Sequence, residues 1–98
     1  MSLPIGSQKI VADGVIGTSG KKIRVYGFIV RATSGGASVV NVYDGTTAGG
    51  VLMDVINIAV STTERPMYCG GLYFGSGCFV DFDANTSFVT AILEQENS

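Results

Sequence analysis

The chain has 98 residues, of which 46% are apolar and 14% are charged, and its net charge is −2 at neutral pH. This length favours a single domain over residues 1–98, and we expect residues 1–6 and 96–98 to be flexible ends. The negative charge balance and the lack of a basic cluster argue against nucleic acid as a partner. No apolar run approaches the roughly 18 residues of a spanning helix, and the N-terminus has no signal-peptide pattern, so no membrane partner is expected.

The low charge is the most unusual feature of the composition. Ordinary soluble domains carry about 25% charged residues, whereas this chain carries 14%. A surface of glycine, serine and threonine, polar without charge, is one explanation. The other is that further copies of the chain, or another partner, cover part of an apolar surface. We favour the second explanation and therefore expect a homo-oligomer.

The first half of the chain predicts a short strand over residues 7–13, a turn region over 14–20 and a long strand over 21–33. Strict alternation in the long strand puts Ile23, Val25 and Ile29 on one face and Tyr26, Phe28 and Val30 on the other. Both faces are apolar, so this strand should be central and covered on both sides. Gly27 within it indicates a bulge or a close backbone approach.

The second half predicts further short strands between glycine-rich turns. Strands are expected over residues 37–44 and 51–60, followed by a polar connection over 61–66. Residues 67–74 and 78–84 should form a hairpin around the Gly-Ser-Gly turn at 75–77, and 87–95 should be the last strand. In this hairpin Cys69 and Cys78 are out of register, so we expect both thiols to be reduced and packed as small apolar groups.

Seven or eight short strands in fewer than a hundred residues predict an all-β fold. The expected architecture is an antiparallel β-sandwich of jelly-roll type, and a small closed barrel is the alternative.

The glycine-rich segment Asn41–Gly50 is the most suggestive motif for ligand binding. It lacks the Lys-Ser/Thr ending and the following helix of a phosphate-binding loop. Asp44-Gly45 is instead a strong turn dipeptide. We interpret the segment as the turn between two strands.

Catalytic and metal-binding chemistry has little support in the sequence. The chain has no histidine, which removes the commonest general base and metal ligand. Asp81 and Asp83 share a strand face and could bind a hard cation with Asn85 or Asp44, but a solvated polar face is the preferred interpretation, since calcium takes about six to eight oxygens. We expect a non-enzymatic protein with no catalytic residue, no metal and no cofactor.

Four tyrosines offer a second kind of binding surface. Tyr26, Tyr43, Tyr68 and Tyr73 could form a platform for a carbohydrate or receptor, because an aromatic ring stacks on the apolar face of a sugar. Packing on the sheet faces is the preferred explanation, and a carbohydrate-binding adhesin module is the alternative function.

Two stretches of the chain resemble short proteins encoded in the structural-gene regions of tailed bacteriophages and prophages. The first ends in a Tyr-Asp-Gly-Thr turn at residues 43–46, and the second combines the glycine-rich segment 70–77 with the strand 78–82. The resemblance covers about residues 7–95. It implies a virion component made in the host cytoplasm, such as a capsid-decoration, head-fibre or tail-associated subunit, with capsid or tail proteins as further partners.

The strand over residues 51–60 is the candidate subunit interface. Its apolar side chains lie on both predicted faces, so the core and a second subunit should bury them together. The candidate interface residues are Val51, Leu52, Met53, Val55, Ile56 and Ile58. A symmetric ring is expected, with a trimer favoured by analogy with other virion fittings.

Overall fold

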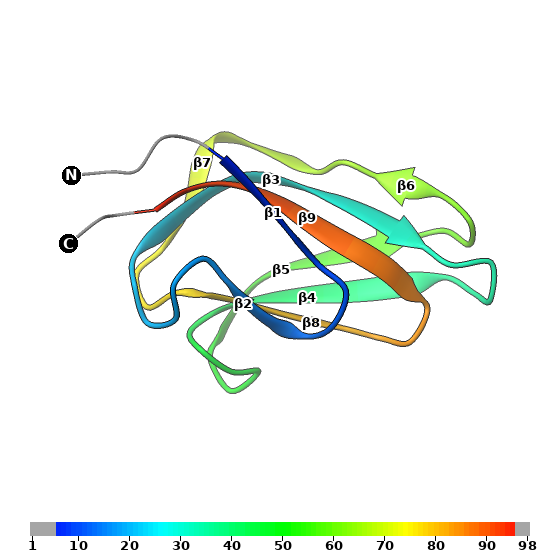
Figure 1. Cartoon of the computed structure of the whole chain (residues 1–98), viewed down its shortest axis with the longest axis horizontal. Coiled ribbons are helices and arrows are strands. Elements are labelled where there is room, and N and C mark those ends of the chain that lie inside the picture. The colour runs from blue at the N-terminus through cyan, green and yellow to red at the C-terminus, as the bar shows by residue number, and fades with distance from the viewer. Residues whose placement is uncertain (1–5, 96–98) are drawn as a thin grey trace.

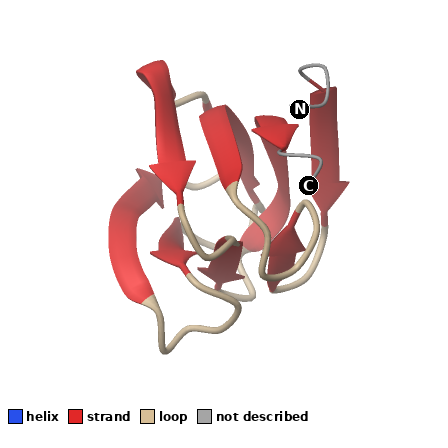
Figure 2. Ribbon diagram, turned by 90° about the vertical axis from the view of Figure 1, so that its left-hand side faces the viewer, coloured by secondary structure: helices blue, strands red, loops and turns tan. Residues whose placement is uncertain are grey.

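The computed structural model describes residues 6–95, and these residues form strands and loops without any helix (Figure 2). The strands are β1 (Gly6–Ile10), β2 (Gly14–Ile16), β3 (Ile23–Ala32), β4 (Ser38–Asp44), β5 (Val51–Ile58), β6 (Thr63–Glu64), β7 (Met67–Phe74), β8 (Cys78–Phe82) and β9 (Thr86–Gln95). Gly6, expected in a flexible end, pairs with Leu93 as the first residue of β1. The other residues of the expected flexible ends, 1–5 and 96–98, lie outside the described residues.

The strands make two antiparallel sheets that pack face to face (Figure 1). One sheet has the order β1-β9-β3, with β6 and β7 both pairing with the far side of β3, and the other has the order β2-β8-β4-β5. The pairs β1–β9, β2–β8, β3–β7 and β4–β5 are nested, as if one long hairpin had been folded over. This is the strand order of a jelly roll, and the predicted β-sandwich is confirmed in place of a closed barrel.

The space between the sheets is filled by fifteen buried apolar side chains. The two largest are Phe28 and Phe74, both from the five-stranded sheet, and most of the others are Val and Ile. β-branched residues of this kind favour strands because their side chains pack well on a pleated surface. The valine-rich segments therefore form strands whose apolar side chains pack between the two sheets.

A bulge in β3 changes which side chains face this core. The register of β3 against both β7 and β9 shifts between Val25 and Gly27. Val25 and Phe28 are consequently both buried, while Tyr26 and Ile29 are only half-buried. The predicted bulge at Gly27 is confirmed, but the predicted face assignment is wrong, because Phe28 and Val30 share the buried face with Val25. β3 is central, as predicted, but it is not covered on both sides, since Arg24 and Arg31 are exposed on its outer face.

Gly27 is required at this position by a close backbone approach. A Cβ atom there would lie 2.7 Å from the carbonyl oxygen of Pro66 and would overlap the sulfur of Met67. The amide of Phe28 also donates to the Pro66 carbonyl at 3.0 Å. β3 and the segment before β7 therefore fit together only without a side chain at residue 27.

The predicted hairpin between residues 67–74 and 78–84 is wrong. β7 pairs with β3 in one sheet, whereas β8 lies between β2 and β4 in the other. Phe74 and Cys78 are both fully buried from opposite sides of the sandwich, so the Gly-Ser-Gly turn crosses between the sheets. Asp44 holds this crossing by accepting hydrogen bonds from the amides of Gly75 and Ser76.

Buried and half-buried polar side chains make hydrogen bonds at both ends of the sandwich. The hydroxyl groups of Ser38 on β4 and Thr86 on β9 are hydrogen-bonded to each other, and both residues are buried. At the other end, the side chain of Gln95 accepts a hydrogen bond from the Thr18 amide at 2.6 Å, and that of Gln8 accepts one from the Gly17 amide at 2.7 Å. Buried polar groups destabilise a fold unless they are hydrogen-bonded. These contacts therefore hold the β2–β3 connection against β1 and β9, and the start of β4 against the start of β9.

Replacing Gly27 by alanine should destabilise the fold by about 1–3 kcal/mol, because the added methyl group has no space beside the Pro66 backbone. The matched control is Gly75→Ala, since a Cβ atom at Gly75 meets nothing within 4 Å. Urea unfolding of the two variants and the unmodified chain measures the difference. Equal unfolding free energies for both variants would contradict the close approach at Gly27.

Candidate functional site

The outer face of the four-stranded sheet carries a continuous row of large side chains. Val15 pairs with Phe79, Phe79 with Tyr43, and Tyr43 with Leu52, so the row crosses all four strands in register. Leu52 is 51% exposed, and the other three members are half-buried. Val39 and Val55, also on this face, are exposed. Four distant parts of the sequence therefore build one apolar surface.

The six candidate interface residues on β5 have different positions in the structure. Ile56 and Ile58 belong to the core of the chain itself, and Met53 is half-buried against that core. The exposed residues are Val51, Leu52 and Val55. Leu52 and Val55 lie on the outer face, since their partners Tyr43 and Asn41 do, and Val51 lies at the end of the strand. A contact of these three residues with another subunit remains a prediction.

β5 is an edge strand whose edge is partly blocked. Its register against β4 shifts between Val42 and Tyr43, which marks a bulge. The carboxylate of Asp54 accepts a hydrogen bond from the amide of Val55 at 2.8 Å and another from the Tyr68 hydroxyl at 2.6 Å. Burial, followed by the hydrogen bond to Asp54, raises the pKa of Tyr68. Bulges and charged side chains are common means of preventing strand addition at an edge, so the face of this sheet is more available than its edge.

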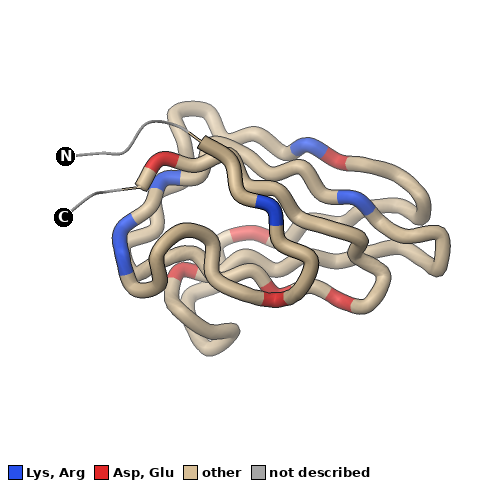
Figure 3. Tube along the Cα trace, viewed as in Figure 1, with Lys and Arg blue, Asp and Glu red and all other residues tan. Residues whose placement is uncertain are grey.

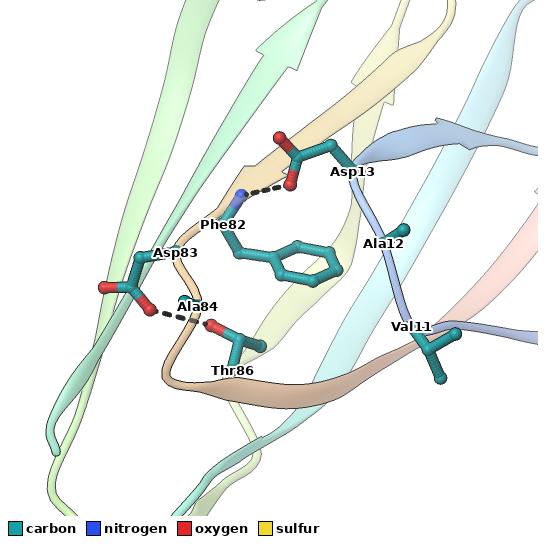
Figure 4. Close-up of a pocket in the computed structure, with 7 residues that line it drawn as sticks. All are labelled: Val11, Ala12, Asp13, Phe82, Asp83, Ala84 and Thr86. Atoms are coloured by element: carbon teal, nitrogen blue, oxygen red, sulfur yellow. Dashed lines mark hydrogen bonds between the residues drawn. The ribbon is translucent and has the colours of Figure 1, made fainter. Parts of the chain in front are cut away.

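An open pocket of about 500 Å³ lies where the β1–β2 connection meets the end of β8 (Figure 4). The ring of Phe82 lies between the segment 11–13 and Thr86 in this view. Asp13 accepts a hydrogen bond from the Phe82 amide at 2.9 Å, while Asp83 accepts bonds from the Asn85 amide and the Thr86 hydroxyl. Both carboxylates thus hold loops in place, which is a structural role.

The acidic residues considered for a cation are not assembled into one site. Asp44 binds the turn between β7 and β8, at the opposite end of β8 from Asp83. Asp83 also accepts a hydrogen bond from the amide of Val39. In the part of the chain that the structure describes, no three His, Cys, Asp or Glu side chains are placed to hold a metal ion.

The four tyrosines do not form a single platform. Tyr43 belongs to the row on the four-stranded sheet, whereas Tyr73 pairs with Arg24 on the other sheet, where Tyr26 donates a hydrogen bond to Glu94. Tyr68 packs edge-on against Phe28, with ring centroids 6.1 Å apart. The dispersed arrangement gives no specific support to the carbohydrate-binding alternative.

The glycine-rich segment that suggested a ligand loop is a turn, as the sequence predicted. Its first residues, through Asp44, complete β4, and residues 45–50 connect β4 to the antiparallel β5. The amide of Gly45 donates to the carbonyl of Gly77 at 2.9 Å. The segment is therefore bound to the crossing between the sheets.

The two cysteines occupy different environments, and the expectation that both are packed is wrong for Cys69. Both thiols are free, but Cys69 is exposed and Cys78 is buried. Gly27 pairs with Met67 and Val25 pairs with Leu72, so four residues of β7 lie opposite a single residue of β3. The extra residues let β7 bulge away from β3 around Cys69. Alternation in the sequence does not reveal such a bulge.

Cys69 should react with a thiol reagent in the native protein, whereas Cys78 should not. Burial, and secondarily the charge of Asp44, raise the pKa of Cys78 to about 12, so this thiol stays protonated in the fold at pH 8, and the thiolate is the reactive form. Labelling with a chromogenic disulfide should therefore modify one thiol natively and two in denaturant. Native labelling of the Cys69→Ser variant would contradict this assignment.

Comparison with known proteins adds no family to this description. Protein-family models, curated proteins and solved structures were all searched, and none matches the chain. The described residues also contain no helix with the length and apolar character that crossing a membrane requires. The function is therefore inferred from the surfaces described above and from the resemblance of the sequence.

Proposed function

We propose that this chain is a non-enzymatic structural protein that self-associates as a subunit of a phage particle. The supporting observation is the apolar row Val15–Phe79–Tyr43–Leu52 on the outer face of the four-stranded sheet. Contiguous exposed apolar surface of this kind is typical of protein–protein contacts. The resemblance to phage structural proteins assigns the assembly to a virion, as a capsid-decoration, head-fibre or tail component.

The chemistry of the outer face favours association over ligand binding. The row has no charged member, and Leu52, Val39 and Val55 are exposed beside it. Aromatic side chains are enriched and charged ones depleted at the centres of protein interfaces. Phe79 and Tyr43 occupy such a central position, and the acid Asp81 lies two residues further along β8, next to Asn41. The arrangement matches an apolar interface centre with a polar rim.

The proposal predicts that the solution mass is a stable multiple of 10.2 kDa, with a trimeric ring as the favoured state. The Leu52→Glu variant should raise the dissociation constant by at least about tenfold, because a charge would enter the apolar row. The control is Val60→Glu, since Val60 is comparably exposed in the connection after β5. Light scattering with size exclusion over a hundredfold dilution gives the mass. A monomer at every concentration would contradict the self-association.

The particle assignment has its own measurement. Virions from a host strain that encodes the chain should contain it at a fixed copy number, measured by quantitative mass spectrometry of purified particles. Its absence from purified particles would refute the virion role.

A further inference from the structure

The two sheets carry opposite charge. The four strands β2, β4, β5 and β8, all of which the structure describes, contain Asp44, Asp54 and Asp81 and no basic residue. The five-stranded sheet carries Lys9, Arg24 and Arg31 against Glu64 and Glu94. Figure 3 shows most basic positions in the upper layer of the sandwich, with another blue segment on the loop at its left end, while most acidic positions lie in the lower layer. Asp44 binds the crossing between the sheets and Asp54 binds Tyr68, so the acids beside the apolar row on the outer face are Asp81 and Asp83. The outer face of the other sheet carries Lys9, Arg24 and Arg31, with Glu94 opposite Arg24.

The outer face of the four-stranded sheet has a groove suited to a cationic side chain. This groove has a volume of about 180 Å³ and is lined by Val39, Asn41, Asp81, Phe82 and Asp83. A hydrogen bond with Asp13 raises the pKa of Asp81, with smaller contributions from burial and from the charge of Asp13. The carboxyl groups of Asp13, Asp81 and Asp83 thus lie close together beside the apolar row, where a nearby cation would favour their charged forms.

The outer face of the five-stranded sheet offers the complementary groups. The ammonium group of Lys9 lies 4.9 Å from the centre of the Phe88 ring, and Arg31 pairs with Phe88 on the neighbouring strand. Arg24 and Arg31 are exposed, while Ile29 between them is half-buried. This face combines cations with apolar and aromatic surface, as the acidic face combines carboxylates with its apolar row.

We propose that the outer face of the five-stranded sheet of one copy docks onto the outer face of the four-stranded sheet of the next copy. This inference rests on the self-association in the proposed function and specifies its surfaces. Docking of two identical acidic faces would place Asp81 and Asp83 of both copies near each other, and juxtaposed like charges are costly. Docking of opposite faces would bring Asp81 and Asp83 of one copy towards the cations Lys9, Arg24 and Arg31 of the next.

The contact is heterologous, because it uses two different patches of the same chain. Heterologous contacts close into a ring where the rotation between copies permits and otherwise continue as a filament. The predicted ring, including a trimer, requires this type of contact, whereas a two-fold dimer does not.

The first test uses the unmodified chain and varies only the salt concentration. Attraction between opposite faces should weaken with ionic strength, because salt screens exposed charges beyond about 10 Å at 0.1 M. The dissociation constant should rise about tenfold between 0.05 and 0.5 M salt. A constant that stays the same or falls with added salt would overturn the proposed pairing of faces.

The second test reverses the charge of each face separately. Asp81→Lys with Asn57→Lys makes the acidic face basic, and Arg24→Glu with Arg31→Glu makes the basic face acidic. Asp83 is left unchanged because it holds the turn before β9. Each double variant alone should raise the dissociation constant about a hundredfold. An equimolar mixture should associate in alternating order, since one variant is then basic on both faces and the other acidic on both, and it should form pairs, even-numbered rings or filaments in place of a trimer. Lys22→Glu is the control, because Lys22 lies in the loop between β2 and β3.

The outcomes separate this inference from the proposed function. Assembly of the unmodified chain, loss of assembly in both variants and recovery in the mixture would support the opposite-face contact. Assembly that survives the Arg24→Glu/Arg31→Glu change would overturn it while leaving self-association intact. A monomeric unmodified chain would refute both. Circular dichroism establishes that each variant is folded, and recovery in the mixture provides the same evidence independently.

Discussion

The fold depends on one irregularity in its central strand. β3 pairs with β9 on one side and with β7 and β6 on the other, and its register shifts against both β7 and β9 between Val25 and Gly27. A one-residue shift moves every following side chain to the other face of a strand. The bulge therefore turns Phe28, the largest core residue of β3, inward together with Val25. Without it, the two halves of β3 would present their apolar side chains to opposite sides of the sheet.

A two-layer sandwich buries only one face of each sheet. In this chain the two outer faces differ in their charged and apolar side chains. The strands of the four-stranded sheet contribute no cation, and an apolar row crosses the outer face of that sheet. The outer face of the five-stranded sheet contributes Lys9, Arg24 and Arg31 among half-buried apolar residues. The few charges of the chain are thus unevenly distributed: Asp81 and Asp83 lie beside the apolar row, whereas Lys9, Arg24 and Arg31 lie on the other sheet together with Glu64 and Glu94. This arrangement links the sparse charge of the sequence to the proposed self-association.

The alternation of apolar residues and the positions of glycine predict most of the strands. They do not predict which distant strands pair with each other. In the first part of β3, alternation correctly places Ile23 and Val25 on one face, because a period of two follows from the strand alone. The hairpin predicted around residues 75–77 is wrong because a Gly-Ser-Gly sequence permits either a hairpin or a crossing between sheets. The burial of Phe74 and Cys78 from opposite sheets decides for the crossing. Glycine marked the bulge in β3, but its effect on Phe28 depended on β7 and β9. The apolar row could not be predicted at all, since its four members are brought into register by pairing across the whole chain.

The contact between opposite faces is tested most directly by zero-length cross-linking of amines to carboxylates in a mixture of ¹⁵N-labelled and unlabelled chains. Lys9 and Asp81 lie on the outer faces of different sheets, and packed sheets are about 10 Å apart, so a link between them within one copy is excluded by the intervening core. Docking of opposite faces should give a mixed-isotope link from Lys9 of one copy to Asp81 or Asp83 of another. Intermolecular links that join only the same face of two copies would contradict it.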